Sequence, residues 1–288
     1  MTIPRLWRHL WTRPATAADR AALLVLISAD RLPGGPALTA RTLDEALAVG
    51  PDRRPDDRTT VAPERPERVV WTREKERTER TEVVHDGSGQ LLGAVCFSPE
   101  TDGAGASIRW LHALEDRAVA DLLVRLVLDH APRCTVRAFA RASPLPPGLP
   151  GLPVHDRAVT RTALEAAGFR TDGQWLYLHR QLPDEGVAGP PSPDRQELTG
   201  RCSTRARPVD ADGATWWIEV DDLARHGGDP YLARCCLDET LAGLAARGAR
   251  DVISCVDNLA PGISGTRTVL YDCGFDEVDA LQSFVYRR

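Results

Sequence analysis

TRTALEAAGF at residues 160–169 is repeated as TRTVLYDCGF at residues 266–275, so the pattern Thr-Arg-Thr-x-Leu-x-x-x-Gly-Phe occurs twice in one chain. Each copy places apolar residues at helical spacing and ends at a glycine, the residue that most often terminates a helix. Both copies lead into apolar-rich stretches that predict strands, QWLYLHRQL at 174–182 and DALQSFVYRR at 279–288. The repeat therefore predicts a short helix and a closing strand in each half of the chain.

The similarity between the halves extends upstream of the short helix. In each half we expect a strand, a long helix and a second strand, in that order. In the first half these elements lie at 105–113, 115–130 and 134–140, and in the second half at 214–220, 229–248 and 250–256. The second half also has a strand candidate at 197–207, and the first half begins with two predicted helices at 15–35 and 38–50 and a hairpin at 81–98.

A stretch with the composition of a linker, PDEGVAGPPSP at 183–193, separates the halves. We expect a first module at residues 1–182, a linker at 183–196 and a second module at 197–288 that lacks the N-terminal helices. Residues 51–82, rich in Pro, Arg and Glu, predict a long surface excursion with one strand near 69–71. The predicted fold class is α+β, with two modules that each have a mixed, mostly antiparallel sheet flanked by helices.

Composition narrows the class of protein. The chain has 288 residues, 42% of them hydrophobic and 27% charged, as in soluble globular proteins. The net charge of −5 gives no indication of a nucleic-acid or membrane partner. No stretch predicts a signal peptide or a membrane span, so we expect a cytoplasmic location. The seven cysteines form no Cys-x-x-Cys pair, which favours buried reduced thiols over disulfides and predicts no metal site. The sequence leaves the oligomeric state open.

The two endings, ALEAAGFR with WLYLHRQL and TVLYDCGF with DALQSFVYRR, resemble the short helix, Gly-Phe and final strand of the GNAT-type N-acetyltransferase superfamily. Residues 218–231, IEVDDLARHGGDPY, are similar to its acyl-CoA segment, where a strand leads to Arg-x-x-Gly-x-Gly/Ala at the start of a helix. Val220, Arg225 and Gly228 keep that spacing, and Pro230 replaces the second small residue. The resemblance covers most of the chain as two halves. It implies a tandem arrangement with acetyl-CoA or another acyl-CoA as co-substrate.

A glycine-bearing turn before a helix suits a phosphate group, because backbone N–H groups and the helix dipole both point at the anion. The alternative is an ordinary capped turn, in which Asp229 and Pro230 only start the helix. On the first interpretation, the residues expected to contact acyl-CoA are Ile218, Val220, Arg225, His226, Gly227, Gly228, Asp229 and Tyr231.

The first half lacks the features of such a turn. It has no glycine between Gly105 and Gly148, and its long helix opens with Glu115-Asp116. These carboxylates favour the helix start but repel a pyrophosphate. We expect the first half to be a degenerate copy without a working acyl-CoA site.

Acyl transfer to an amine needs a base for the ammonium proton, and an acid can protonate the leaving thiolate. Glu219 is the predicted base, with Asp221 and Asp222 as equal alternatives. The other interpretation is that all three are solvated charges of the strand end and loop. The resemblance implies a tyrosine four residues before the glycine of Gly-Phe, but Leu164 and Leu270 occupy that position. Tyr271 comes one residue later, about 100° around the helix. It is the predicted acid, and the alternative is a half-exposed helix tyrosine.

Two tryptophans and two histidines near these strands are secondary candidates. Trp216 and Trp217 are neighbours on one strand and should face opposite sides, so that one fills the core and the other lines an acceptor pocket. His226 is a candidate acyl-CoA contact, and His112 ranks below it.

The predicted function is acyl transfer from acyl-CoA to the amine of a small molecule. The acyl-CoA site would be in the second module, with the acceptor cleft between the modules. The alternative is a catalytically inactive GNAT-fold binding or interaction protein. The absent glycines of the first half, together with Asp229, Pro230 and the shifted Tyr271, favour that alternative.

Overall fold

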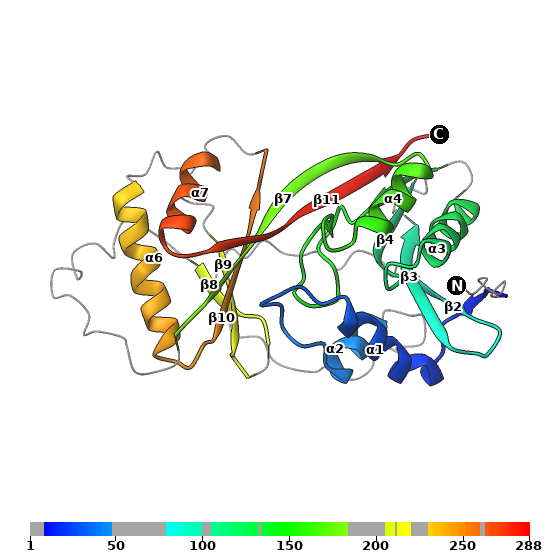
Figure 1. The fold of residues 1–288 in the computed structure, drawn as a ribbon, viewed down its shortest axis with the longest axis horizontal. Coiled ribbons are helices and arrows are strands. Elements are labelled where there is room, and N and C mark those ends of the chain that lie inside the picture. The colour runs from blue at the N-terminus through cyan, green and yellow to red at the C-terminus, as the bar shows by residue number, and fades with distance from the viewer. Residues whose placement is uncertain are drawn as a thin grey trace, which may run out of the picture.

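One mixed sheet of 11 strands runs through both halves of the chain (Figure 1). The computed structural model describes residues 9–47, 79–99, 105–131, 134–183, 205–210, 212–219, 230–259 and 263–288. The strands are β1 (Trp11–Pro14), β2 (Arg80–His85), β3 (Leu91–Pro99), β4 (Gly105–His112), β5 (Thr135–Ala138), β6 (Leu152–Pro153), β7 (Arg170–Gln181), β8 (Arg205–Pro208), β9 (Thr215–Glu219), β10 (Asp251–Asp257) and β11 (Asp276–Tyr286). The helices are η1 (Ala17–Asp19), α1 (Arg20–Ala29), α2 (Ala40–Leu47), α3 (Arg117–His130), α4 (Ala158–Ala166), α6 (Pro230–Ala245) and α7 (Ile263–Asp272).

The last strand of each half pairs with strands of the other half. The order along the sheet is β1-β2-β3-β4-β5-β11-β7-β10-β9-β8, with the short β6 also paired to β11. β11, from the end of the chain, lies between β5 and β7, while β7 lies between β11 and β10. Each half therefore relies on the other half's closing strand to extend its part of the sheet.

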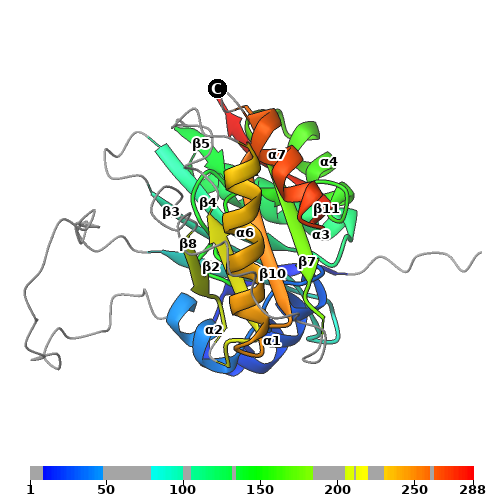
Figure 2. The same ribbon diagram turned by 90° about the vertical axis from the view of Figure 1, so that its left-hand side faces the viewer.

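The helices divide between the two faces of this sheet. Leu176 on β7 is paired with Ala280 on β11, and these side chains belong to the apolar clusters beneath α3, α4, α6 and α7. Tyr177 and Leu281, one position along each strand, face the other way, toward the side that carries α1 and α2. Figure 2 looks onto α6 and α7, which cover the β8–β10 end of the sheet.

The twin TRTxLxxxGF stretches fold alike. α4 and α7 are followed by Gly168 and Gly274, both with positive φ (94° and 77°), a conformation that glycine adopts at little cost. The amide of the following phenylalanine donates to the carbonyl of the repeated leucine, at 3.0 Å in the first copy and 3.1 Å in the second. The predicted short helices ending at Gly-Phe are confirmed.

The parallel strand pairs separate at equivalent points in the two halves. β4 is paired with β5 from Gly105 to Ile108. Beyond Ile108, β4 continues without β5 as a partner along that edge. In the second half, β9 is paired with β10 from Thr215 to Ile218, and β10 continues to Asp257. All other pairings in the described part of the sheet are antiparallel, as the predicted mixed, mostly antiparallel α+β fold requires.

Most predicted elements are present in the described residues. The two N-terminal helices, the hairpin β2–β3 and the strand–helix–strand order of each half are confirmed. Strands β1 and β6 were not predicted. The strand expected near 69–71 and most of the linker at 183–196 lie outside the described residues, so the division into modules stays a prediction. No disulfide joins the six cysteines within the described ranges, and no helix in those ranges is long and apolar enough to cross a membrane.

Candidate functional site

The predicted acyl-CoA segment is described only at its two ends. Ile218 is fully buried against α6, and its carbonyl accepts a hydrogen bond from Ser254 Oγ at 3.0 Å. Glu219 is the half-buried last residue of β9. Tyr231 is 69% exposed in the first turn of α6. The other predicted contacts, Val220, Arg225, His226, Gly227, Gly228 and Asp229, lie outside the described residues, as do Asp221 and Asp222.

Tyr271 lies on the outer side of α7. Its hydroxyl donates to Glu277 Oε2 at 2.8 Å, and Arg267 approaches the same hydroxyl at 3.3 Å. Leu270 fills the buried position next to it, as Leu164 does in the first copy. Within the described ranges, no hydrogen bond or ion pair joins Tyr271 to Glu219.

The two neighbouring tryptophans of β9 face opposite sides, as predicted. Trp216 packs beside the α6 cluster, where the Arg247 guanidinium lies 5.8 Å from its ring centre. Trp217 belongs to a cluster on the opposite face that also contains Leu32 and Tyr177. This second cluster joins residues of both halves, so it helps to hold them in one unit.

The start of α3, where the first half would place a phosphate, is closed by its own carboxylates. Asp116 caps the helix, accepting from the amides of Ala118 at 2.9 Å and Val119 at 3.4 Å. Glu115 turns to the next helix and accepts from Thr160 Oγ1 at 2.7 Å and from the first amides of α4. An acyl-CoA pyrophosphate would have to displace these carboxylates. The arrangement supports the expectation that the first half has no acyl-CoA site.

A cavity of about 110 Å³ lies beside the point where β4 and β5 separate. Its walls come from α1 and the segment that follows it, from the end of β4, from residues 139–153 and from Leu281 on β11. Most of the lining is apolar, with Leu32, Leu145 and Leu149 among its members, and the polar lining includes several arginines and His112. The cavity therefore has the mixed lining that small-molecule sites usually show.

A bulge in β4 turns two consecutive side chains toward this cavity. Trp110 is paired with Cys96 and Ile108 with Phe97, so Arg109 is an extra residue on β4. Arg109 and Trp110 both line the cavity, although strict alternation would place them on opposite faces.

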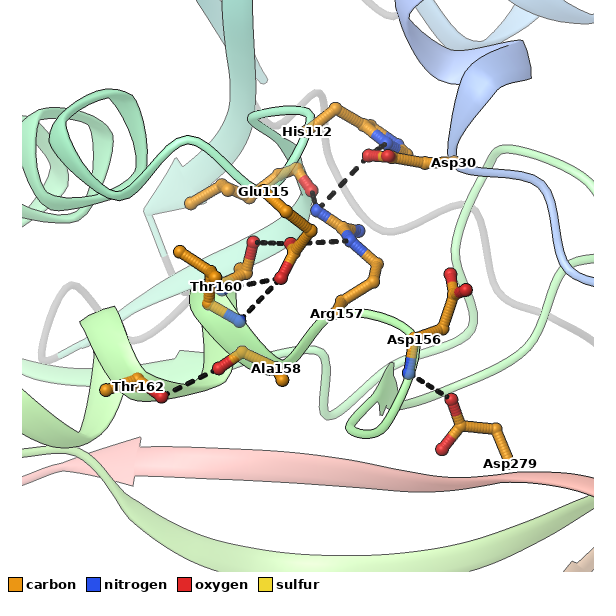
Figure 3. Close-up of polar contacts among 11 residues, drawn as sticks. Asp30, His112, Glu115, Asp156, Arg157, Ala158, Thr160, Thr162 and Asp279 are labelled. Atoms are coloured by element: carbon orange, nitrogen blue, oxygen red, sulfur yellow. Dashed lines mark hydrogen bonds and ion pairs between the residues drawn. The ribbon is translucent and has the colours of Figure 1, made fainter. Parts of the chain in front are cut away.

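Three buried ionisable side chains of the cavity lining, those of Asp30, His112 and Arg157, lie close together (Figure 3). Asp30, just after α1, accepts from His112 Nδ1 at 2.8 Å and lies 3.5 Å from the Arg157 guanidinium. Arg157 also lies 3.9 Å from Glu115 and donates to the carbonyl of Leu111. Arg157 is thus held between two carboxylates that come from distant parts of the chain.

This arrangement determines the protonation of the histidine. Burial by itself would raise the pKa of Asp30, but the His112 hydrogen bond and the charge of Arg157 together keep it below its ordinary value. Burial lowers the pKa of His112 below its ordinary value of 6.5, although Asp30 opposes the shift. At neutral pH the imidazole is therefore neutral. Its Nδ1–H donates to the ionised Asp30, and Nε2 is left as a hydrogen-bond acceptor.

The lowered pKa of His112 predicts a loss of stability in mild acid. Because the unfolded chain binds this proton near pH 6.5 and the folded chain only at lower pH, stability falls as the pH drops below about 6.5. The contribution of His112 is at most about 1.4 kcal/mol per pH unit. Urea unfolding at pH 7.5, 6.5 and 5.5 should show a steeper decline for the wild type than for His112→Gln. Parallel curves for the two proteins would contradict the prediction.

The segment between α1 and α2 packs against β7, the strand that pairs with β10 of the second half. The Tyr177 hydroxyl donates a hydrogen bond to the carbonyl of Pro33 at 3.0 Å. Gly34 has a φ of 69°, and a Cβ there would lie 2.1 Å from the His179 ring. The close approach requires glycine, and it fixes the wall of the cavity that contains Leu32.

The sequence contained little signal for this cluster. By sequence alone His112 ranks below His226, and nothing marks Asp30 or Arg157 as a candidate. Asp30 and His112 lie 82 positions apart in the chain, so no local pattern connects them. The only local indication was Glu115-Asp116 between β4 and α3, interpreted as a helix start that repels phosphate. The structure shows that Glu115 also caps α4 and pairs with Arg157.

No protein-family model and no curated protein matches this sequence. Among solved structures, a GCN5-related N-acetyltransferase from Sphaerobacter thermophilus is similar over 99% of this chain and 96% of its own, with TM-score 0.53 and 15% identity. A tandem GNAT protein from the clavulanic acid biosynthesis pathway matches 96% of this chain and 98% of its own, with TM-score 0.54 and 13% identity. A glucosamine N-acetyltransferase region of a fungal multi-domain β-N-acetylglucosaminidase matches 98% of this chain and 38% of its own, with TM-score 0.55 and 10% identity. Across both of its halves, the chain therefore has the fold of the GCN5-related N-acetyltransferases.

Proposed function

We propose that the protein transfers an acyl group from acyl-CoA to the amine of a small molecule. The observation that carries this proposal is the similarity of the whole chain, rather than of one half, to GCN5-related N-acetyltransferase structures. The separation of parallel strands in each half provides support, because it leaves strand edges that a ligand chain can pair with.

We place the acyl-CoA in the second half, at residues 218–231. Ile218 is the last residue of β9 paired with β10, so Glu219 begins the part of the strand that has no β10 partner. The following turn and the first residues of α6 would hold the phosphates, through Arg225, Gly228 and their neighbours. The closed start of α3 supports this choice over the first half. The acceptor would enter between the two halves.

Acyl-CoA supplies a thioester, whose carbonyl carbon is attacked by the amine while the C–S bond breaks. In this proposal Glu219 accepts the proton that the ammonium loses before the attack, and Tyr271 donates a proton to the departing thiolate. The tyrosinate then takes the second proton that the nitrogen loses as the amide forms. For that role the Tyr271 hydroxyl must release its hydrogen bond to Glu277 and donate to the thiolate instead. A CoA thiolate leaves readily near neutral pH, so Tyr271 assists the reaction without being indispensable.

Acetyl-CoA is expected to stabilise the protein against thermal unfolding. At a concentration about 100-fold above Kd, one site adds about 2.7 kcal/mol to the free energy of unfolding. Gly228→Glu should remove the shift by placing a carboxylate in the phosphate turn. Gly243→Glu on α6 is the matched control, because a Cβ at Gly243 meets nothing within 4 Å. Differential scanning calorimetry measures both variants, and equal shifts in the two would contradict the placement.

A second candidate function is a GNAT-fold binding protein without turnover. The buried Leu164 and Leu270, at the positions where the superfamily resemblance implies an acid, favour it. Release of free thiol from acetyl-CoA with a panel of primary amines separates the two functions. A thermal shift without thiol release supports the binding protein. The absence of a shift with any acyl-CoA would end both the enzymatic proposal and its cofactor assignment.

A further inference from the structure

Four arginine side chains line the cavity beside β4, and two of them have partners inside the protein. Arg157 is held by the two carboxylates described above. Arg109 lies 3.5 Å from Glu79 and donates to the carbonyl of Ala142 at 3.0 Å. Their charges are therefore already balanced.

The other two arginines of the lining are not balanced in this way. Arg31 and Arg141 are exposed, and neither makes a hydrogen bond or ion pair within the described part of the chain. Among the described residues, Asp30 is the carboxylate that lines the cavity, and it is shared by the histidine and the buried arginine. Asp156 lies near this cluster in Figure 3 but does not line the cavity. The cavity thus carries excess positive charge, and guanidinium groups bind carboxylates with two parallel hydrogen bonds.

His112 presents a buried hydrogen-bond acceptor to the cavity. His112 is 8% exposed, its Nδ1 is occupied by Asp30, and its Nε2 has no partner in the described residues. A ligand hydroxyl can donate to Nε2. The side chains of Leu32, Leu145 and Leu149 provide an apolar wall of the same cavity.

We propose that this cavity binds a small carboxylic acid with an apolar body and a hydroxyl group. The carboxylate pairs with Arg31 and Arg141, the apolar body packs against the leucines, and the hydroxyl donates to His112 Nε2. None of the residues that line the cavity belongs to the segment at 218–231. It requires no acyl-CoA, so it stands whether or not the protein is a transferase.

The test uses 3-(4-hydroxyphenyl)propionate as the probe, with binding to the full chain measured by ligand-observed NMR or calorimetry. A ligand of this size is expected to bind at about millimolar Kd or tighter. Its neutral analogue, 3-(4-hydroxyphenyl)propan-1-ol, should bind about 10-fold more weakly because it cannot pair with the arginines. The analogue without the phenol hydroxyl, 3-phenylpropionate, should bind about threefold more weakly than the probe.

Two variants assign these preferences to residues. The double variant Arg31→Gln/Arg141→Gln should bind the acid and the alcohol equally, because it lacks the two guanidinium groups that pair with the carboxylate. Both side chains are exposed, so the variant should fold like the wild type. Arg125→Gln, an exposed arginine on α3 that does not line the cavity, is the matched control and should keep the 10-fold preference. His112→Leu should abolish the difference between the phenol and 3-phenylpropionate, with circular dichroism confirming that the variant is folded.

Three results would overturn the proposal. They are no binding of the probe at 10 mM, equal binding of the acid and the alcohol by the wild type, and a preference for the acid that survives loss of both arginines. None of these depends on acetyl-CoA, so they are distinct from a failure of the transferase assay.

Discussion

Arg157→Met is expected to lower the free energy of unfolding by about 3–5 kcal/mol, the range for removing one partner from a buried ion pair. Arg157 is only 5% exposed and lies between Asp30 and Glu115. Methionine fills similar space but leaves both carboxylates without their cation and the carbonyl of Leu111 without its donor. Urea unfolding monitored by fluorescence measures the loss.

Arg161→Met, one turn further along α4, is the control for this prediction. Arg161 pairs with the exposed Glu165 at 3.6 Å on the same helix, and such surface pairs contribute about 0–1 kcal/mol. Arg157 immediately precedes α4 and Arg161 lies in its first turn, so the two substitutions remove one arginine each from neighbouring positions and their difference isolates burial and the two carboxylates. A loss below about 1 kcal/mol for Arg157→Met would mean that the cluster does not stabilise the fold.

Leu270→Ala is expected to cost about 2–5 kcal/mol, and Leu164→Ala a similar amount. Both leucines are fully buried, each in the apolar cluster beneath its own short helix. Truncation leaves a cavity that close-packed neighbours fill only in part. Thermal or chemical denaturation of the two variants tests whether the twin stretches play equal roles in the two halves.

Tyr271→Ala provides the comparison for Leu270→Ala. The Tyr271 side chain is 38% exposed, and its hydroxyl bonds to Glu277 at the surface, so its loss should cost less than about 1.5 kcal/mol. If the tyrosine variant were the less stable of the two, the helix face assigned to the core would be wrong. In the assigned orientation, the leucine serves packing and the tyrosine remains available for another partner.

Local sequence patterns predicted most of the fold. The Gly-Phe endings, the amphipathic α3 and the hairpin β2–β3 depend on residues close together in the chain, and each is present where expected. Strands β1 and β6 are not predicted, because they are too short to show the alternation of apolar and polar residues that indicates a strand. Of the predicted site, Glu219 and Tyr271 are described but not joined, and the central turn at 220–229 lies outside the described residues.

The cavity cluster could not be predicted in the same way. Asp30 follows α1, His112 ends β4 and Arg157 precedes α4, so only the packing of three distant segments brings them together. The bulge at Arg109 also interrupts the alternation of side chains along β4. Residues on its two sides therefore do not face the sides of the sheet that a simple alternating pattern predicts.

The sequence by itself determined that the chain contains two related halves, each with a strand, a long helix, a strand, a short helix ending at Gly-Phe and a closing strand. Helical and strand periods are local properties, and the repeated ten-residue pattern expresses them twice. Only the tertiary structure decided where the closing strands pair: β11 lies beside β5, and β7 lies beside β10. Each closing strand is apolar on both faces, with Leu176 and Tyr177 of β7 as neighbours that face opposite sides. A strand that is apolar on both faces suits any central position in the sheet. Packing between the halves therefore decides which position each closing strand takes.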